Sequence, residues 1–255
     1  MMEKRNQHIH PRVIVFLLLD GSGAINTIKF KYDQYIGDPI NLVRIFNHKE
    51  ADEMVITSKT ASKVGIDFKV LGDIAASARF PLSYCGGVSS LEDASRIIQL
   101  GYEKVSLNST YSPQLTTRIA KEFGTSCVSV SIDVKKSLIG GYRRFQHTTE
   151  KTQTLNIKEF AIEAESAGAG ELIINMVDKD GTYSGYDIDF VRDLTDHIGI
   201  PIVICGGARN LVDMKKASDA GCSAFGASSM FVFFGAERGV LPTYPSFDEL
   251  QQALR

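Results

Sequence analysis

The feature of this sequence that most constrains its fold is a regular alternation of short apolar runs with longer amphipathic stretches. Eight β-branched runs predict strands, at Arg12–Leu19, Glu53–Ser58, Leu82–Cys85, Lys104–Asn108, Cys127–Asp133, Glu171–Val177, Ile202–Cys205 and Ala224–Ala227. Eight stretches rich in Ala, Leu, Glu and Lys predict helices, at Pro39–Lys49, Lys63–Ala78, Leu91–Leu100, Pro113–Phe123, Ile157–Ala167, Ile188–His197, Leu211–Ala220 and Phe247–Leu254. Apolar strands that alternate with helices are typical of a parallel sheet. Eight such units predict an α/β fold of the closed (β/α)8 type, the TIM barrel.

Length and composition agree with this fold and exclude other classes. A barrel of this type needs about 250 residues, so we expect the 255 residues to form one domain, 1–255. The formal net charge of −2 gives no electrostatic basis for binding nucleic acid or an anionic membrane. No apolar run approaches the ~20 residues of a membrane span, and the polar start lacks the features of a signal peptide. We therefore expect a cytoplasmic protein.

Four Cys without CxxC spacing and five scattered His predict no metal site, and we expect no cofactor.

An internal repeat indicates that the barrel consists of two similar halves. Residues 81–110 and 201–230 align without a gap at an offset of 120 residues. In both segments a Pro precedes a strand that ends in Cys-Gly-Gly, and later Leu, Asp, Gly and Ser residues coincide. Convergent strand–turn–helix chemistry is the alternative explanation. We favour two half-barrels, each with four strand–helix units.

Each repeat also carries a pattern that suits phosphate. Two glycines at the carboxyl end of a strand let backbone N–H groups approach an anion closely, and the start of the next helix adds donors. A lone Gly-Gly pair is usually only a turn, but two copies at matching positions predict two phosphate sites and an elongated bisphosphate substrate across the barrel mouth. The first site would use Gly86, Gly87, Asn108 and Ser109, and the second Gly206, Gly207, Ser228, Ser229 and Gly181.

Carboxylates follow two of the predicted strands. Asp133 ends the fifth strand, at the end of the barrel where catalytic groups lie, and it could act as a general acid or base. The alternative is that it caps the following loop. Asp178 and Asp180 lie in a run of acids and turn-forming residues after the sixth strand, which indicates a functional loop or, alternatively, a solvated one.

Several motifs together resemble the cyclase subunit of imidazole glycerol phosphate synthase. They are Asp180-Gly-Thr-x-x-Gly-Tyr-Asp187, Ala167-Gly-Ala-Gly-Glu171, Pro201-x-x-x-x-Gly-Gly207, Gly86-Gly-x-x-Ser-Leu-Glu-Asp-Ala94 and Ser129-x-x-Ile-Asp133, and the similarity runs from about Arg12 to Phe231. The resemblance implies a ribulose-phosphate-binding (β/α)8 barrel of the histidine biosynthesis type. It also implies a glutaminase partner, a class I glutamine amidotransferase subunit, on the bottom face of the barrel. In the family, ammonia from that partner passes through the barrel and attacks a ribulose-phosphate-bearing substrate, which yields imidazole glycerol phosphate.

The resemblance also assigns a ring of four charged residues at the barrel bottom. The family's ammonia gate matches Arg12, Glu53, Lys104 and Glu171, and all four charges are of the right sign. Each residue precedes or opens a predicted strand, as a bottom-face residue should. Ordinary surface charge is the alternative interpretation.

The catalytic positions depart from the family. Its fifth-strand aspartate matches Asp133, but its first-strand aspartate falls on Leu18, its first-loop lysine on Asn26 and its second-strand aspartate on Ser58. A leucine cannot transfer a proton, and loss of a general acid or base typically costs about 10²–10⁴ in rate. Asp20 shares the strand face of Leu18 and is a candidate substitute, but it would lie about 6.6 Å further along the strand. The candidate catalytic residues are therefore Asp133, Asp180 and Asp20.

These observations are compatible with three functions. In the first, the chain is a divergent paralogue that lacks the first catalytic aspartate. It then aminates another phosphorylated or nucleotide-linked substrate, such as a sugar for surface polysaccharide of the lipopolysaccharide type. Alternatively, it is a genuine histidine-pathway cyclase, or a non-catalytic barrel that activates a glutaminase. Leu18, Asn26 and Ser58 argue against the second function, while Asp133 and the Gly-Gly loops argue against the third. We favour the first.

Overall fold

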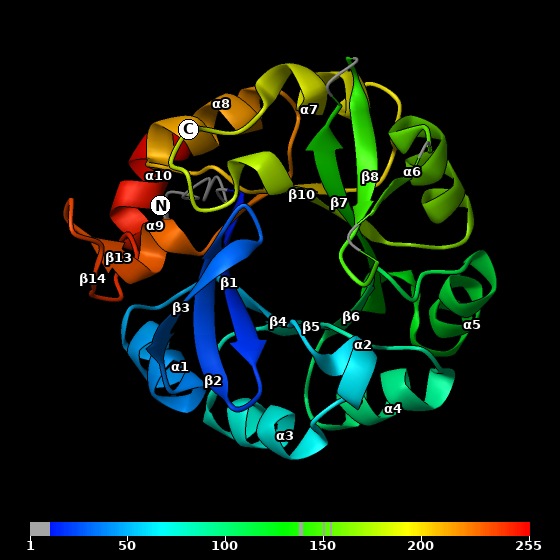
Figure 1. Cartoon of the computed structure of the whole chain (residues 1–255), viewed down its shortest axis with the longest axis horizontal. Coiled ribbons are helices and arrows are strands. Elements are labelled where there is room, and N and C mark those ends of the chain that lie inside the picture. Colours follow the sequence, from blue (N-terminus) through cyan, green and yellow to red (C-terminus); the bar gives the residue numbers. More distant parts are fainter. Residues whose placement is uncertain (1–10, 138–139, 150, 154) are drawn as a thin grey trace, which may run out of the picture.

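The computed structural model describes residues 11–137, 140–149, 151–153 and 155–255, and within them a closed ring of eight parallel strands. Consecutive ring strands pair along the chain, and the last pairs with the first, with Arg12 opposite Ala224. This closure confirms the predicted (β/α)8 barrel (Figure 1). The ring strands are β1 (Arg12–Asp20), β4 (Glu53–Ser58), β5 (Leu82–Cys85), β6 (Lys104–Leu107), β7 (Val128–Lys136), β10 (Glu171–Met176), β11 (Ile202–Cys205) and β12 (Ala224–Ala227).

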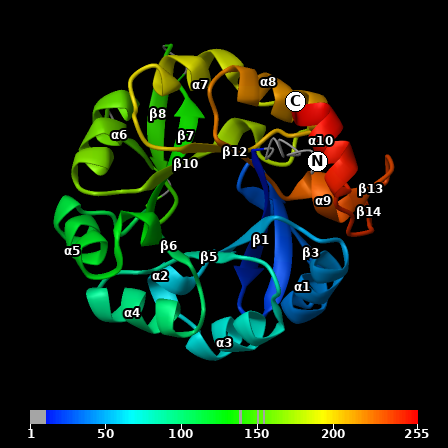
Figure 2. The ribbon, with the colours of Figure 1, turned by 180° about the vertical axis from the view of Figure 1, so that it is seen from behind.

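Helices surround the ring of strands, as both faces of the molecule show (Figures 1 and 2). Local capping sets where several of them begin: the Asp38 side chain accepts from the N–H of Asn41, and Ser90 forms a reciprocal capping box with Asp93. The outer helices are α1 (Pro39–His48), α3 (Phe68–Ser77), α4 (Leu91–Gln99), α5 (Pro113–Phe123), α6 (Ile157–Ser166), α7 (Ile188–Thr195), α8 (Leu211–Asp219) and α10 (Phe247–Leu254).

The prediction of a single helix over Lys63–Ala78 is wrong, because two helices cover this segment. Gly65 adopts φ +92°, which ends the short α2 (Ala61–Val64), and Asp67 then caps α3 with bonds from two backbone N–H groups. Further short elements are η1 (Thr125–Cys127), η2 (Val177–Lys179), α9 (Ser229–Val232), β13 (Phe233–Phe234) and β14 (Gly239–Val240).

Two antiparallel additions extend ring strands over the carboxyl-terminal end of the barrel. β1 continues into β2 (Gly23–Ile28) and β3 (Lys31–Gly37), a hairpin that the sequence did not indicate. β7 continues into β8 (Tyr142–Gln146) and β9 (Lys151–Gln153). The second addition falls in the basic, Gly-containing excursion between β7 and α6. Both additions reach the mouth of the barrel and contribute side chains there.

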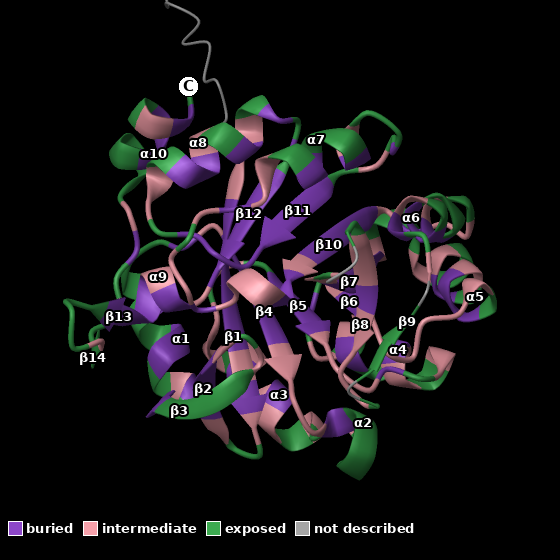
Figure 3. Cartoon of the chain, turned by 45° about the horizontal axis from the view of Figure 1, so that its top comes forward, coloured by how far each residue is buried: buried purple, intermediate pink, exposed green. Residues whose placement is uncertain are grey.

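The buried residues form two separate cores. The larger lies between the sheet and the helices, so that the strands are buried on both faces while the helices expose their outer sides (Figure 3). The smaller fills the barrel interior and comprises Ile14, Phe16, Val55, Ile173, Val203, Cys205 and Ala224. Alternation along each strand directs every second side chain to each core. None of the described helices is long and apolar enough to cross a membrane.

The Phe16 ring is the largest side chain of the interior core, and it occupies space that Gly226 leaves free. A Cβ atom on Gly226 would meet Phe16 Cε2 and Cδ2. Gly226 lies in the middle of β12, where glycine otherwise weakens a strand. The pair Phe16–Gly226 is therefore a matched large–small contact across the barrel.

We expect Gly226→Ala to lower the free energy of unfolding by about 1–3 kcal/mol because the added methyl overpacks the interior. The same change in a Phe16→Leu background should cost less than half as much, since the shorter side chain leaves room. Urea denaturation of the four proteins of this double-mutant cycle measures both values. Additive costs would show that the two residues do not share this space.

Candidate active site at the mouth of the barrel

One cavity lies at the carboxyl-terminal ends of the ring strands, and it unites nearly all of the predicted site residues. It encloses about 1360 Å³ of empty space, part of which is open solvent. Its lining includes all nine predicted phosphate-site residues together with Asp133 and Asp180. The two Gly-Gly loops come from β5 and β11, which lie on opposite sides of the ring. The cavity is therefore shaped to contact both ends of an elongated molecule.

The first glycine loop has no room for side chains. Gly87 adopts φ +66°, and a Cβ atom there would lie 2.8 Å from the carbonyl carbon and oxygen of Ala61. Asn108 and Ser109, at the end of the neighbouring β6, line the cavity together with this loop. Close backbone packing leaves N–H groups rather than side chains at the cavity wall, which is the arrangement that suits an anion.

In the second half, Asn26 is bonded to both serines of the predicted phosphate site. Its Nδ2 donates to Ser229 Oγ at 2.9 Å, and its Oδ1 accepts from Ser228 Oγ at 2.8 Å. Asn26 is buried and belongs to β2. Asn26 is therefore held as a neutral neighbour of both serines.

Asp133 is buried and held by two amides at the cavity wall. Asn108 Nδ2 donates to one carboxylate oxygen at 2.9 Å, and Asn175 Nδ2 donates to the other at 3.2 Å. Burial raises the pKa of Asp133, while the two amide donors oppose that rise. A fixed carboxyl group with a raised pKa is suited to proton transfer near neutral pH.

Asp180 lines the cavity too, but its carboxylate anchors the β2–β3 hairpin. Oδ2 accepts from Thr27 Oγ1 at 2.6 Å and from the Phe30 N–H at 3.2 Å. Burial raises the pKa of Asp180, and the Thr27 hydroxyl opposes the rise. Asp180 therefore holds the hairpin over the cavity. The neighbouring Asp178 instead accepts from the Lys136 N–H at 2.8 Å, at the start of the β7–β8 connection.

The role of Asp20 as a substitute acid stays a prediction, and Asp20 is not among the described residues that line the cavity. At that point β1 turns into the β2 hairpin, with Asp20 opposite Gly23. The Asp20 carboxylate lies 3.7 Å from Lys59 Nζ, which also pairs with Asp33 of β3. Leu18, by contrast, does line the cavity, so an apolar side chain occupies the first-strand position.

Among the cavity residues that the sequence did not single out are Lys59 and His147. Lys59 is the single Lys or Arg among the described residues of the lining, and its position directly after β4 was the available signal. His147 reaches the cavity from the turn between β8 and β9. No local motif surrounds it, so only the three-dimensional structure reveals it. Cys85 also lines the cavity, but burial raises the pKa of its thiol to about 12, which disfavours a nucleophilic thiolate.

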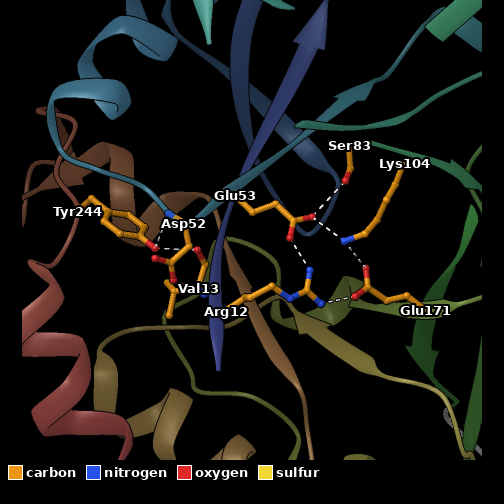
Figure 4. A network of polar contacts seen from close by, with 8 residues as sticks. All are labelled: Arg12, Val13, Asp52, Glu53, Ser83, Lys104, Glu171 and Tyr244. Atoms are coloured by element: carbon orange, nitrogen blue, oxygen red, sulfur yellow. Dashed lines mark hydrogen bonds and ion pairs between the residues drawn. The ribbon is translucent and has the colours of Figure 1, made fainter. Parts of the chain in front are cut away.

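The four predicted gate residues meet at the opposite, amino-terminal end of the barrel (Figure 4). Arg12 pairs with both Glu53 and Glu171, and Lys104 Nζ lies 3.2 Å and 3.6 Å from the same two carboxylates. Ser83 adds a hydrogen bond to Glu53 at 3.1 Å. Both glutamates are buried. The arrangement is a ring of alternating charge across the barrel axis rather than scattered surface charge.

We expect Lys104→Met to lower the free energy of unfolding by about 2–4 kcal/mol, because two buried carboxylates would then share only Arg12. Chemical denaturation of the variant measures this loss. Lys63→Met on α2 removes the same charge from an exposed side chain that has no ion pair with another described residue, and it serves as the control. Equal effects of the two changes would show that the ring contributes no more than surface charge.

Comparisons with known proteins agree with the motifs and the geometry. The family model of the histidine biosynthesis proteins matches residues 12–236. A protein of Pseudomonas aeruginosa, provisionally named imidazole glycerol phosphate synthase subunit hisF2, is 37% identical over 95% of this chain and 98% of its own length. A provisionally named subunit hisF3 of Vibrio vulnificus is 38% identical over 96% of this chain and 97% of its own. The imidazole glycerol phosphate synthase subunit HisF of Thermobifida fusca is 33% identical over 87% and 90%. The chain therefore belongs to the histidine biosynthesis protein family, as a divergent relative of the cyclase subunit of imidazole glycerol phosphate synthase.

Proposed function

We propose that this chain is the ammonia-using subunit of a glutamine-dependent complex and that it aminates a phosphorylated substrate without closing an imidazole ring. One observation carries the proposal: the cavity is lined by Asp133 and both glycine loops, and by the apolar Leu18 on the first strand. The substrate class that we infer is a phosphorylated or nucleotide-linked sugar, of the kind used for surface polysaccharide.

Support for a phosphorylated substrate comes from the two glycine loops on opposite sides of one cavity. Each loop presents backbone N–H groups and a neighbouring Ser to the same space. Neither loop relies on a nearby free cation, since Lys59 is already paired with Asp33 and Asp20. Backbone donors bind phosphate through geometry as well as charge. The two loops would therefore recognise the phosphate groups at both ends of the substrate by the positions of their N–H groups.

Support for ammonia and for a glutaminase partner comes from the charged ring at the other end of the barrel. The ring closes the amino-terminal end directly beneath the interior core, with two acids and two bases that balance one another. A small neutral molecule could pass such a ring once an ion pair opens, whereas larger solutes could not. The relatives carry the name of a synthase subunit, which fits a chain that works with a partner. We infer a class I glutaminase bound at this face as a heterodimer.

Support for a lost ring-closing step comes from all three substituted positions. Leu18 is apolar, Asn26 is committed to two serines, and Ser58 Oγ accepts from the Ala61 N–H at 3.1 Å, at the start of α2. None of the three is placed to exchange a proton with a substrate. A genuine histidine-pathway cyclase is the second candidate, and the retained Asp133, glycine loops and charged ring are what favour it.

A reconstitution experiment tests the missing acid directly. We expect Leu18→Asp to raise the formation of imidazole glycerol phosphate, from the family's ribulosyl substrate and excess ammonium salt, by about 10²–10⁴-fold over the parent chain. Leu18→Asn adds similar bulk and polarity without a proton to transfer, so it is the matched control. The ammonium salt removes any need for the glutaminase.

A Leu18→Asp variant no faster than Leu18→Asn, with both folded by circular dichroism, would contradict the proposal. So would a parent chain that already equals Leu18→Asp, because ring closure would then not depend on this position.

A further inference from the structure

The turn between β8 and β9 places an imidazole in the cavity. A hydrogen bond from the Thr149 N–H to the Gln146 carbonyl closes the turn, and His147 and Thr148 between them line the same cavity as Asp133. Because β8 pairs directly with β7, the strand that carries Asp133, the turn is tied to the catalytic strand.

An edge-on aromatic contact fixes the position of the ring. The His147 and Phe30 ring centroids lie 6.1 Å apart with an interplanar angle of 89°, and Phe30 also meets Phe145 edge-on at 6.3 Å. The Phe30 backbone is in turn held by Asp180. The two hairpins therefore meet over the mouth of the barrel through these three rings, with His147 on the cavity side.

The ring nitrogens of His147 are free to bind a substrate. Among the described residues, neither nitrogen has a hydrogen-bond partner. The other charged groups of the lining are committed: Lys59 to Asp33, and Asp180 to Thr27. His147 and Asp133 are therefore both titratable groups whose side chains are held in place. Each can still form a hydrogen bond to a substrate.

We propose that His147 is the second proton-transfer group of this cavity, a catalytic residue that acts with Asp133 on a substrate carbonyl held between the glycine loops. The proposal rests on the amination proposed above and names its missing acid. It assigns to a hairpin residue the role that the family gives to the first strand, where this chain has Leu18.

The electrostatic surroundings support the pairing. The charge of His147 is among the influences that lower the pKa of Asp133 against the dominant effect of burial. The charged groups of the neighbouring elements are Asp133, Lys135 and Lys136 on β7, Arg143 and Arg144 on β8, Lys151 on β9, Asp180 after β10, Lys59 after β4, and Lys29 and Lys31 on either side of Phe30.

The proposed step balances as follows. The ammonia lone pair forms a C–N bond to the carbonyl carbon, and the C=O π pair moves onto the oxygen. Protonated His147 gives its proton to that oxygen, and the Asp133 carboxylate accepts a proton from the new ammonium nitrogen. The product carries one hydroxyl and one amino group on the same carbon. Loss of water then gives the imine, and proton exchange with solvent restores both side chains.

The first test measures ammonia addition without requiring ring closure. The ribulosyl substrate is incubated with ¹⁵N-ammonium salt, the imine is reduced with cyanoborohydride, and the labelled amine is quantified by mass spectrometry. We expect His147→Gln to slow its formation about 10²-fold or more. His197→Gln is the matched control, because His197 is exposed on the surface near the end of α7, where its Nδ1 donates to the Asp193 carbonyl oxygen. Equal rates for His147→Gln and the parent chain would overturn the proposal.

A second measurement tests the pairing without any substrate, so its outcome does not depend on the proposed function. The His147 resonance is assigned in ¹³C-histidine-labelled protein by its loss in His147→Gln, and its chemical shift at one fixed pH is compared between the parent chain and Asp133→Asn. We expect the His147 resonance to move in Asp133→Asn, because a nearby carboxyl group is replaced by a neutral amide, with the His197 resonance unchanged. An unchanged His147 resonance would overturn the pairing.

Discussion

The pairing of β12 with β1 is the constraint on which the rest of the structure depends. Once the parallel ring is closed, the first residues of the strands must meet at one end and the last residues at the other. Arg12, Glu53, Lys104 and Glu171 therefore form one charged ring, although they are up to 159 positions apart in the sequence. The same closure gathers Asp133 and both glycine loops around one cavity. Local propensity forms the units, but only closure turns them into a site.

The two halves of the barrel share a backbone plan and differ in their side chains. Both halves retain a Gly-Gly loop. Near the first loop Lys59 is paired with an acid, whereas the serines near the second loop are bonded to the neutral Asn26 of β2. The barrel interior differs in a similar way, with Phe16 placed against Gly226. The anion-binding backbone and the charged ring thus accompany changed side chains at the catalytic positions. This combination is the basis on which we propose amination without ring closure.

The sequence predicted those features that depend on local pattern or repetition. Apolar runs located the ring strands, and the repeat located the glycine loops, because both signals lie within a few neighbouring residues. The β2–β3 hairpin was missed because β3 is mostly polar and exposed and the turn uses Lys29 and Phe30 at positive φ instead of glycine. Strand alternation also could not show that β1 pairs with an antiparallel hairpin at Asp20, which lies opposite Gly23. His147 reaches the cavity only through the packing of two hairpins, which no local pattern encodes.

The most direct measurement of the central claim follows nitrogen into product. The parent chain and Asp133→Asn are incubated with ¹⁵N-ammonium salt and a pool of phosphorylated and nucleotide-linked sugars, and products are analysed by mass spectrometry. The account predicts that a phosphate-bearing product gains one ¹⁵N atom with the parent chain and not with Asp133→Asn. Label that appears in no phosphorylated product, or that appears equally with both proteins, would contradict it.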